Sequence, residues 1–206
     1  MSASKNEIKD IHMDVLREIG NIGAGNAATS LSKLMQRKID MSVPSVQILE
    51  LNEVSAALGG EENIVAGIYF QISGDINGFI MLLLDIQSSK TLTNILMMRE
   101  DSSNELDEMD KSALQEVGNI LSGAYVSSLS SLTNLSINIS VPSLCIDMAG
   151  AILSVPAIYF SHISDKILLI NTAMNEHSDK SVNANFLLIP DFDSFKTLMN
   201  SLGVAL

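Results

Sequence analysis

Two stretches of the chain repeat apolar residues at the spacing of an α-helix. In Ile8–Met35 apolar residues recur three or four positions apart, and Met109–Leu132 repeats the pattern. Such spacing gathers the apolar side chains on one face, so we expect two long amphipathic helices. Asp107 or Asp110 is placed to cap the start of the second helix.

The segments between these helices have the patterns of β-strands. Lys38–Glu50 alternates apolar and polar residues, and its Pro44 is expected at a bulge or a sheet edge because proline cannot donate a hydrogen bond. The apolar run Gly78–Leu84 predicts a buried strand. Ala149–Phe160 is ambiguous, and we interpret it as helical despite Pro156. The other predicted elements are strands at Ile64–Ser73 and Phe79–Asp85, joined as a hairpin, a helix at Ser88–Met98, strands at Ser136–Ile146, Lys166–Met174 and Asn185–Pro190, and a helix at Phe192–Leu202.

The chain repeats itself at an offset of 98 positions. Aligning Asp14–Val46 with Ser112–Leu144 without a gap gives 15 identical residues in 33 columns. We infer a tandem duplication, with the acidic stretch Asp101–Asp110 at the junction and halves near residues 1–103 and 104–206. The predicted fold is α+β, a single domain of two homologous halves. An antiparallel sheet is flanked by the long amphipathic helices and has pseudo-two-fold symmetry.

Charge and composition narrow the range of functions. The 206 residues carry 12 Lys+Arg against 24 Asp+Glu, a net charge of −12, which disfavours nucleic acid and anionic membranes as partners. The single cysteine, Cys145, excludes an intramolecular disulfide and a cysteine-built zinc site. The polar amino terminus has no signal-peptide pattern, and no apolar run approaches the length of a membrane span. A cytoplasmic protein is expected.

The candidate chemistry is a stripe of polar residues on each long helix. Asp14, Glu18 and Asn21 lie within about 60° of one another around the first helix. Their counterparts in the second helix are Ser112, Glu116 and Asn119. Asparagine inside a helix costs about 0.5 kcal/mol relative to alanine, which suggests that its amide is used. The alternative is that the asparagines bond to neighbouring backbone and the glutamates are simply solvated.

Repeated glycines accompany each stripe. Gly20 and Gly25 recur as Gly118 and Gly123. They would let a helix pack closely on the sheet or let another protein approach the polar stripe. The Gly23–Ala28 segment imitates a dinucleotide-binding GxGxxA motif, but a predicted helix precedes it where that motif needs a strand.

No other catalytic pattern is present in the sequence. The three histidines, His12, His162 and His177, are scattered without an acid or cysteine at metal-ligand spacing. An enzyme built on this chain would therefore act with carboxylates and carboxamides, by placing water on an already reactive substrate such as an acyl-phosphate.

The repeated residues resemble a known signature. Asp14-x3-Glu18-x2-Asn21-x22-Pro44, with its second copy from Ser112 to Pro142, is similar to the [Asp/Ser]-x3-Glu-x2-Asn-x22-Pro signature of the CheC/CheX/FliY family of chemotaxis phosphatases. The resemblance covers essentially the whole chain. Two intact copies in about 200 residues distinguish this chain from CheX proteins, which keep one site per chain, and from FliY proteins, which continue into a flagellar-switch domain.

The resemblance implies hydrolysis of the phospho-aspartate on a CheY-type response regulator. Asn21 and Asn119 would hold the attacking water, and Glu18 and Glu116 would pair with the regulator's lysine. Asp14 and Ser112 would support the site. No cofactor is expected on this chain, because the Mg²⁺ would belong to the regulator. The alternative from another class is a non-catalytic adaptor that binds the regulator or the receptor deamidase CheD.

The two halves differ after their matched prolines. Asp147 aligns with Leu49, and it precedes the apolar segment Met148–Leu153. Asp147 would either cap a helix that begins near Met148 or, given the resemblance, form part of a docking surface for a CheD-like partner.

Overall fold

The two long helices are present as predicted. The computed structural model describes residues 10–99, 103, 105–159, 166–176 and 181–203. Helix α1 spans Asp10–Met35 and α4 spans Glu108–Thr133, and the predicted start of the first helix at Ile8 lies outside the described residues. Asp107 is the N-cap of α4, and its carboxylate accepts a hydrogen bond from the Asp110 amide at 2.8 Å. Asp110 is the third helical residue and returns a bond to the Asp107 amide, which completes a capping box.

The remaining elements also follow the predicted order. The ambiguous segment is helical as interpreted, and the 64–85 region is a hairpin. The elements are β1 (Ile39–Glu50), α2 (Leu51–Ala57), β2 (Ile64–Gly74), β3 (Gly78–Asp85), α3 (Ile86–Met97), β4 (Ile137–Ile139), β5 (Ser143–Met148), α5 (Ala149–Tyr159), β6 (Lys166–Glu176), β7 (Ser181–Pro190) and α6 (Phe192–Ser201).

One prediction about these elements was wrong, and one element was missed. The strand expected at Ser136–Ile146 is split into β4 and β5, because the chain leaves the ladder around Pro142. Helix α2 was not predicted at all, although Glu50 and Glu53 form a capping box at its start. The corresponding proline of the first half, Pro44, lies at a register shift of the edge strand β1, as expected.

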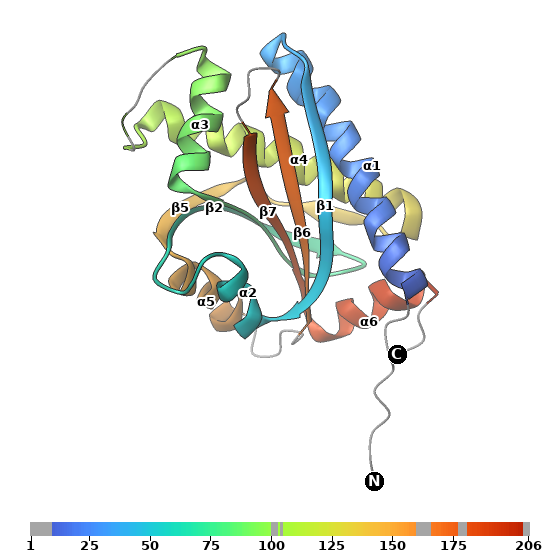
Figure 1. The fold of residues 1–206 in the computed structure, drawn as a ribbon. Coiled ribbons are helices and arrows are strands. Elements are labelled where there is room, and N and C mark those ends of the chain that lie inside the picture. Colours follow the sequence, from blue (N-terminus) through green and yellow to red (C-terminus); the bar gives the residue numbers. More distant parts are fainter. Residues whose placement is uncertain (1–9, 100–102, 104, 160–165, 177–180, 204–206) are drawn as a thin grey trace.

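Within the described residues, seven strands form one antiparallel sheet in which the two halves are interleaved (Figure 1). The order is β1-β6-β7-β3-β2-β4, with β5 also paired to β2. The first strand of each half therefore pairs with the hairpin of the other half, and the central contact joins β3 to β7. Read from either edge, the order places equivalent strands in equivalent positions, in agreement with pseudo-two-fold symmetry.

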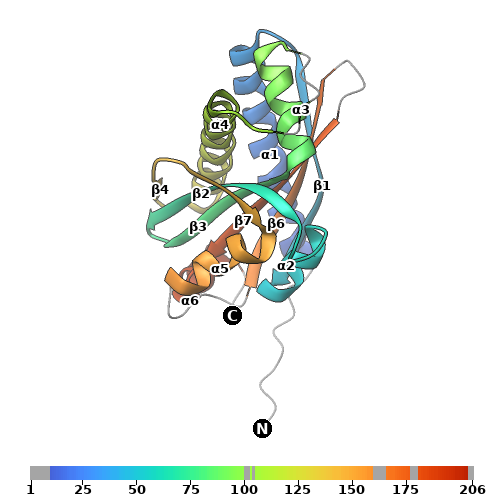
Figure 2. The same cartoon turned by 90° about the vertical axis from the view of Figure 1, so that its left-hand side faces the viewer.

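Helices cover both faces of the sheet (Figure 2). Helices α1, α3, α4 and α6 contribute buried side chains to the larger apolar cluster, and α2 and α5 contribute to a smaller cluster on the opposite face. The β3 run that was predicted to be buried is buried throughout Gly78–Leu84. The sheet thus serves as a platform that carries α1 and α4 side by side.

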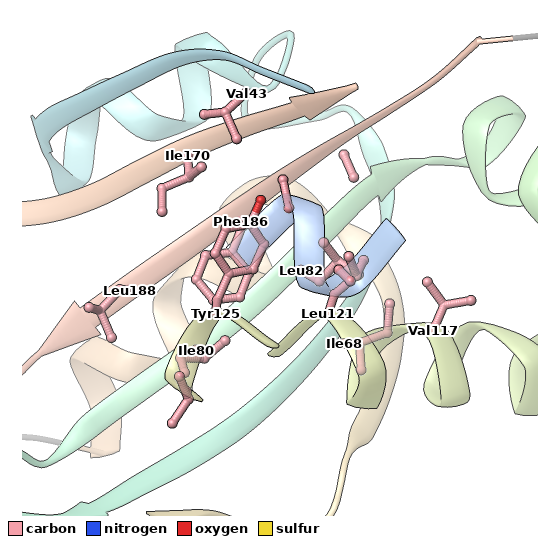
Figure 3. Close-up of a cluster of buried hydrophobic side chains, with 14 of the residues drawn as sticks. Val43, Ile68, Ile80, Leu82, Val117, Leu121, Tyr125, Ile170, Phe186 and Leu188 are labelled. Atoms are coloured by element: carbon pink, nitrogen blue, oxygen red, sulfur yellow. The ribbon is translucent and has the colours of Figure 1, made fainter. Parts of the chain in front are cut away.

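Tyr125 of α4 packs among the buried side chains of the core (Figure 3). Its ring lies 4.4 Å, centroid to centroid, from the ring of Phe186 on β7. Its hydroxyl is 2.8 Å from the Thr172 hydroxyl on β6, so the one polar atom of this buried side chain is hydrogen-bonded. This anchor fixes α4 on strands that belong to the second half.

Candidate functional site

The polar stripes of α1 and α4 point away from the sheet. Glu18 and Asn21 are exposed on α1, and Glu116 and Asn119 are exposed on α4. Among the residues between those of each stripe, Leu16 and Leu114 are fully buried. On each helix, a carboxylate and a carboxamide are therefore exposed to solvent, while the opposite side of the helix packs in the core.

The leading residues of the two stripes have different surroundings. Asp14 is exposed and accepts a hydrogen bond from Arg17 at 2.9 Å, whereas Ser112 is exposed near the start of α4. Gln115, the neighbour of Glu116, donates to the carbonyl oxygen of Pro142 at 3.4 Å. In the second half this hydrogen bond joins the proline segment to α4 next to Glu116.

The glycines divide into two groups. A Cβ on Gly20 would lie 3.3 Å from Val43 Cγ1, and one on Gly118 would lie 2.7 Å from Ile68 Cγ2, so these two allow close packing on the sheet. A Cβ on Gly25 or Gly123 would meet nothing within 4 Å. Gly20 and Gly118 therefore fit the packing use, whereas the approach of another protein at the open Gly25 and Gly123 stays a prediction.

The GxGxxA segment lies wholly inside α1. A dinucleotide fingerprint needs a strand that turns into a helix, so the segment does not form that site. Gly23, its first glycine, instead packs on Tyr125 of α4, where an added Cβ would lie 2.5 Å from the ring atom Cδ1. This contact joins the two site helices directly.

A groove of about 480 Å³ runs between the outward sides of α1 and α4. Asn119 lines it from α4, and Asn26, Thr29 and Ser30 line it from α1. Asn26 also donates to the Ser128 hydroxyl at 3.5 Å. Sequence reasoning missed the α1 residues of this groove, because nothing in the helical pattern shows which neighbour a helix packs against.

A buried ionic network anchors the start of α4. Lys90 of α3 is 2% exposed, and its Nζ contacts Asp110 Oδ2 at 3.0 Å and the carbonyl oxygen of Glu105 at 2.9 Å. Arg99 also pairs with Asp110. Burial raises the pKa of the Asp110 carboxyl, but hydrogen bonds from Thr93 and Lys90 and from the Asp107 backbone outweigh burial and lower that pKa to about 2. The sequence indicated Asp110 only as a possible cap.

Asp147 does not occupy the N-cap position that was considered for it. It is an exposed residue of β5, paired with Val65, and α5 begins two residues later at Ala149. The Asp147 carboxylate accepts a hydrogen bond from the Met148 amide at 2.8 Å. The first amides of α5, at Ala149 and Gly150, donate instead to backbone carbonyls of the turn that precedes β2. The capping interpretation was therefore wrong.

Neither a metal centre nor a membrane span is found within the described ranges. There, His, Cys, Asp and Glu side chains form no group of three or more that could hold a metal ion. Within the same ranges, no helix combines the length and apolar character needed to cross a bilayer. His162 and His177 lie outside the described residues.

Comparisons with known proteins agree with the internal repeat. Residues 11–48 and 109–146 each match the CheC-like family, and the second match begins 98 positions after the first. The chain is 36% identical over 205 residues to the CheY-P phosphatase CheC of Bacillus subtilis, covering 98% of both proteins. It is 32% identical over 139 residues to the flagellar motor switch phosphatase FliY of the same organism, covering 66% of this chain and 36% of that protein.

A solved structure matches the fold. Thermotoga maritima FliY superposes with a TM-score of 0.76 at 24% identity, covering 95% of this chain and 98% of that one. The helix-covered antiparallel sheet is thus the fold of that structure. With near-complete coverage of a CheC relative and two copies of the family's motif region at the repeat offset, the chain belongs to the CheC-like family.

Proposed function

We propose that this chain is a phosphatase that accelerates hydrolysis of the phospho-aspartate on a CheY-type response regulator. The observation that carries the proposal is the pair of outward stripes, each with an exposed Glu and Asn three positions apart on a rigidly packed helix. The names of its relatives, a CheY-P phosphatase and a motor switch phosphatase, support the same chemistry.

Asn21 and Asn119 orient the attacking water. A carboxamide both accepts from and donates to water, so it fixes the orientation of that water without a shifted pKa. Exposure of both side chains allows them to reach into a partner's active site. Because an acyl-phosphate already hydrolyses spontaneously, a gain of roughly 1.5–3 kcal/mol in transition-state stabilisation accelerates it about 10–150-fold.

Glu18 and Glu116 guide the regulator by pairing with a lysine of its active site. Each glutamate lies one helical turn before its asparagine, so the ion pair and the water are held at adjacent positions. Asp14 and Ser112 support the beginning of each stripe. The Mg²⁺ needed at the phosphoryl group is supplied by the regulator, and the reaction takes place in the cytoplasm, where the exposed thiol of Cys145 remains reduced.

The test measures decay of the phosphorylated regulator with and without the chain. Asn21→Ala and Asn119→Ala should each lower the acceleration, and the double variant should remove it. Helix propensity favours alanine at these exposed positions by about 0.5 kcal/mol, so unfolding does not explain a loss. Asn200→Ala on α6 is the matched control, because Asn200 is also an exposed helical asparagine. Wild-type hydrolysis by the double variant would refute the assignment.

A second function, binding of a CheD-like deamidase, is favoured by the exposed edge of β5. Ile146, Asp147 and Met148 are all exposed there, and Ile158 of the adjoining α5 is 82% exposed. An apolar edge with one carboxylate offers both backbone pairing and a charge to a partner. This surface lies on different elements from the stripes, so the adaptor and phosphatase functions are separable by mutation.

A further inference from the structure

The groove between α1 and α4 belongs to the surroundings of the second stripe. Asn119, the asparagine of that stripe, lines its α4 side, whereas Asn21 of the first stripe does not line it. A phospho-aspartate brought to Asn119 therefore brings the surface of its protein against this groove. The α1 side of the groove is formed by exposed residues, namely Asn26, Thr29 and Ser30.

The groove is polar but uncharged. No charged side chain is present among the described residues that line it. A Cβ added to Gly123, which also lines the groove, would meet nothing within 4 Å, so a partner's main chain has room to approach there. Amides and hydroxyls match the N–H and C=O groups of a main chain. Because active-site residues often lie on loops with exposed backbone, we expect the loop beside the phospho-aspartate to occupy this groove.

Asn26 has the most hydrogen-bonding positions on the α1 side of the groove. Its carboxamide has two donor hydrogens and an acceptor oxygen, whereas the Thr29 hydroxyl already donates to the Gly25 carbonyl at 3.0 Å. Asn26 Nδ2 donates to Ser128 Oγ at 3.5 Å, a long and therefore weak hydrogen bond. Asparagine is less favourable than alanine inside a helix, and this weak bond gives little in return. The exposed carboxamide is therefore better explained by a partner outside the chain.

The repeat has no second copy of this carboxamide. At the offset of 98 positions, Asn26 aligns with Ala124. We propose, resting on the phosphatase function above, that Asn26 is a docking residue of the second site. Its carboxamide bonds to the main chain of the regulator's loop, while Asn119 on the facing helix acts on the water. The second site is thus composite across α1 and α4, and the first site, around Asn21, has only a methyl group at the corresponding position.

The test introduces Asn26→Ala into two single-site backgrounds. Asn21→Ala leaves the second site active, and Asn119→Ala leaves the first. In the Asn21→Ala background, loss of one hydrogen bond should raise KM for the phosphorylated regulator about 2–10-fold at nearly constant kcat, because Asn26 contacts the bound partner and not the water. The Asn119→Ala background should show no comparable rise. The measurement is steady-state phosphate release with the regulator kept phosphorylated by excess small-molecule phosphodonor.

Ser128→Ala, in the Asn21→Ala background, is the matched variant for a purely structural role. It removes the α4 partner of Asn26 but keeps the carboxamide on the groove, so KM should stay near that of the background. Asn200→Ala on α6 is the control for loss of an exposed helical asparagine elsewhere.

A rise in KM that is specific to Asn26→Ala and to the second site would support the docking role. An unchanged KM, an equal rise in both backgrounds, an equal rise for Ser128→Ala, or an inactive Asn21→Ala background would overturn it. Each of these outcomes leaves the phosphatase function intact as long as the wild type accelerates hydrolysis. Absence of acceleration by the wild type would instead refute the phosphatase function itself.

Discussion

Replacing the two open glycines by alanine should stabilise the protein while impairing its site. Gly25 and Gly123 lie inside helices, where glycine costs about 0.5–1 kcal/mol relative to alanine. An added Cβ at either position meets nothing within 4 Å, so no packing penalty offsets this gain. The double variant should therefore gain about 1–2 kcal/mol, which for a chain of this length raises Tm by roughly 2–8 °C.

Gly118→Ala on α4 is the matched contrast. There the added methyl would lie 2.7 Å from Ile68 Cγ2 in the fully buried core, so overpacking of about 1–3 kcal/mol should exceed the helix-propensity gain. Thermal and urea unfolding followed by circular dichroism measure both effects. A double variant of Gly25 and Gly123 that is no more stable than wild type, or a Gly118→Ala variant that is equally stabilised, would refute the packing argument.

The same double variant also tests whether the approach of the regulator requires glycine at these two positions. Gly25 and Gly123 each follow the site asparagine by one helical turn, on the same stripe. If the regulator's backbone approaches there, the methyl groups should raise KM for the phosphorylated regulator although the protein is more stable. Unchanged kinetics would show that the approach of the regulator does not require these glycines.

Three further variants test other parts of the structure. The pKa of the Asp110 carboxyl is about 2, below its ordinary value of 3.8. The ionised carboxylate therefore stabilises the folded protein above about pH 4, and this stabilisation is lost as the pH falls toward 2. Asp110→Asn should cost about 2–3 kcal/mol in urea unfolding at pH 7 by leaving Lys90 buried with a weaker partner, and should lose less stability than wild type between pH 4 and pH 2. Glu18→Lys with Glu116→Lys should weaken binding of the regulator more at low than at high ionic strength, and salt-independent binding equal to wild type would contradict the ion pair. Asp147→Asn should weaken CheD binding in a pull-down titration without changing Tm or phosphatase activity, whereas full-strength binding would exclude its carboxylate from the interface.

The repeat and the periodicity predicted most of the elements, because each depends on residues that are near in sequence. Helix α2 was missed because seven residues are too few for a helical pattern, and β1 runs directly into it. The interleaving of the halves was also missed, since alternation indicates which face of a strand is buried but not which strand lies beside it.

In the candidate site, too, features set by residues near in sequence were predicted and features set by distant residues were not. The spacing predicted that Glu18 and Asn21 share one stripe of the helix, and their exposure agrees with that position. The burial of Lys90 was not predicted, because it depends on the carboxylate of Asp110 and on the carbonyl of Glu105, which only the folded chain brings to it. Long-range partners of this kind leave no local pattern in the sequence.

Interleaving makes each site depend on the opposite half of the chain. A Cβ added to Gly20, beside Asn21, would lie 3.5 Å from Ile170 Cγ2 on β6, a strand of the second half. Gly118, beside Asn119, packs on Ile68 of β2, a strand of the first half. Each site helix therefore rests in part on a hairpin of the other half. The duplicated sites are copies in sequence, but they are mechanically parts of one unit, because neither helix has a complete platform within its own half.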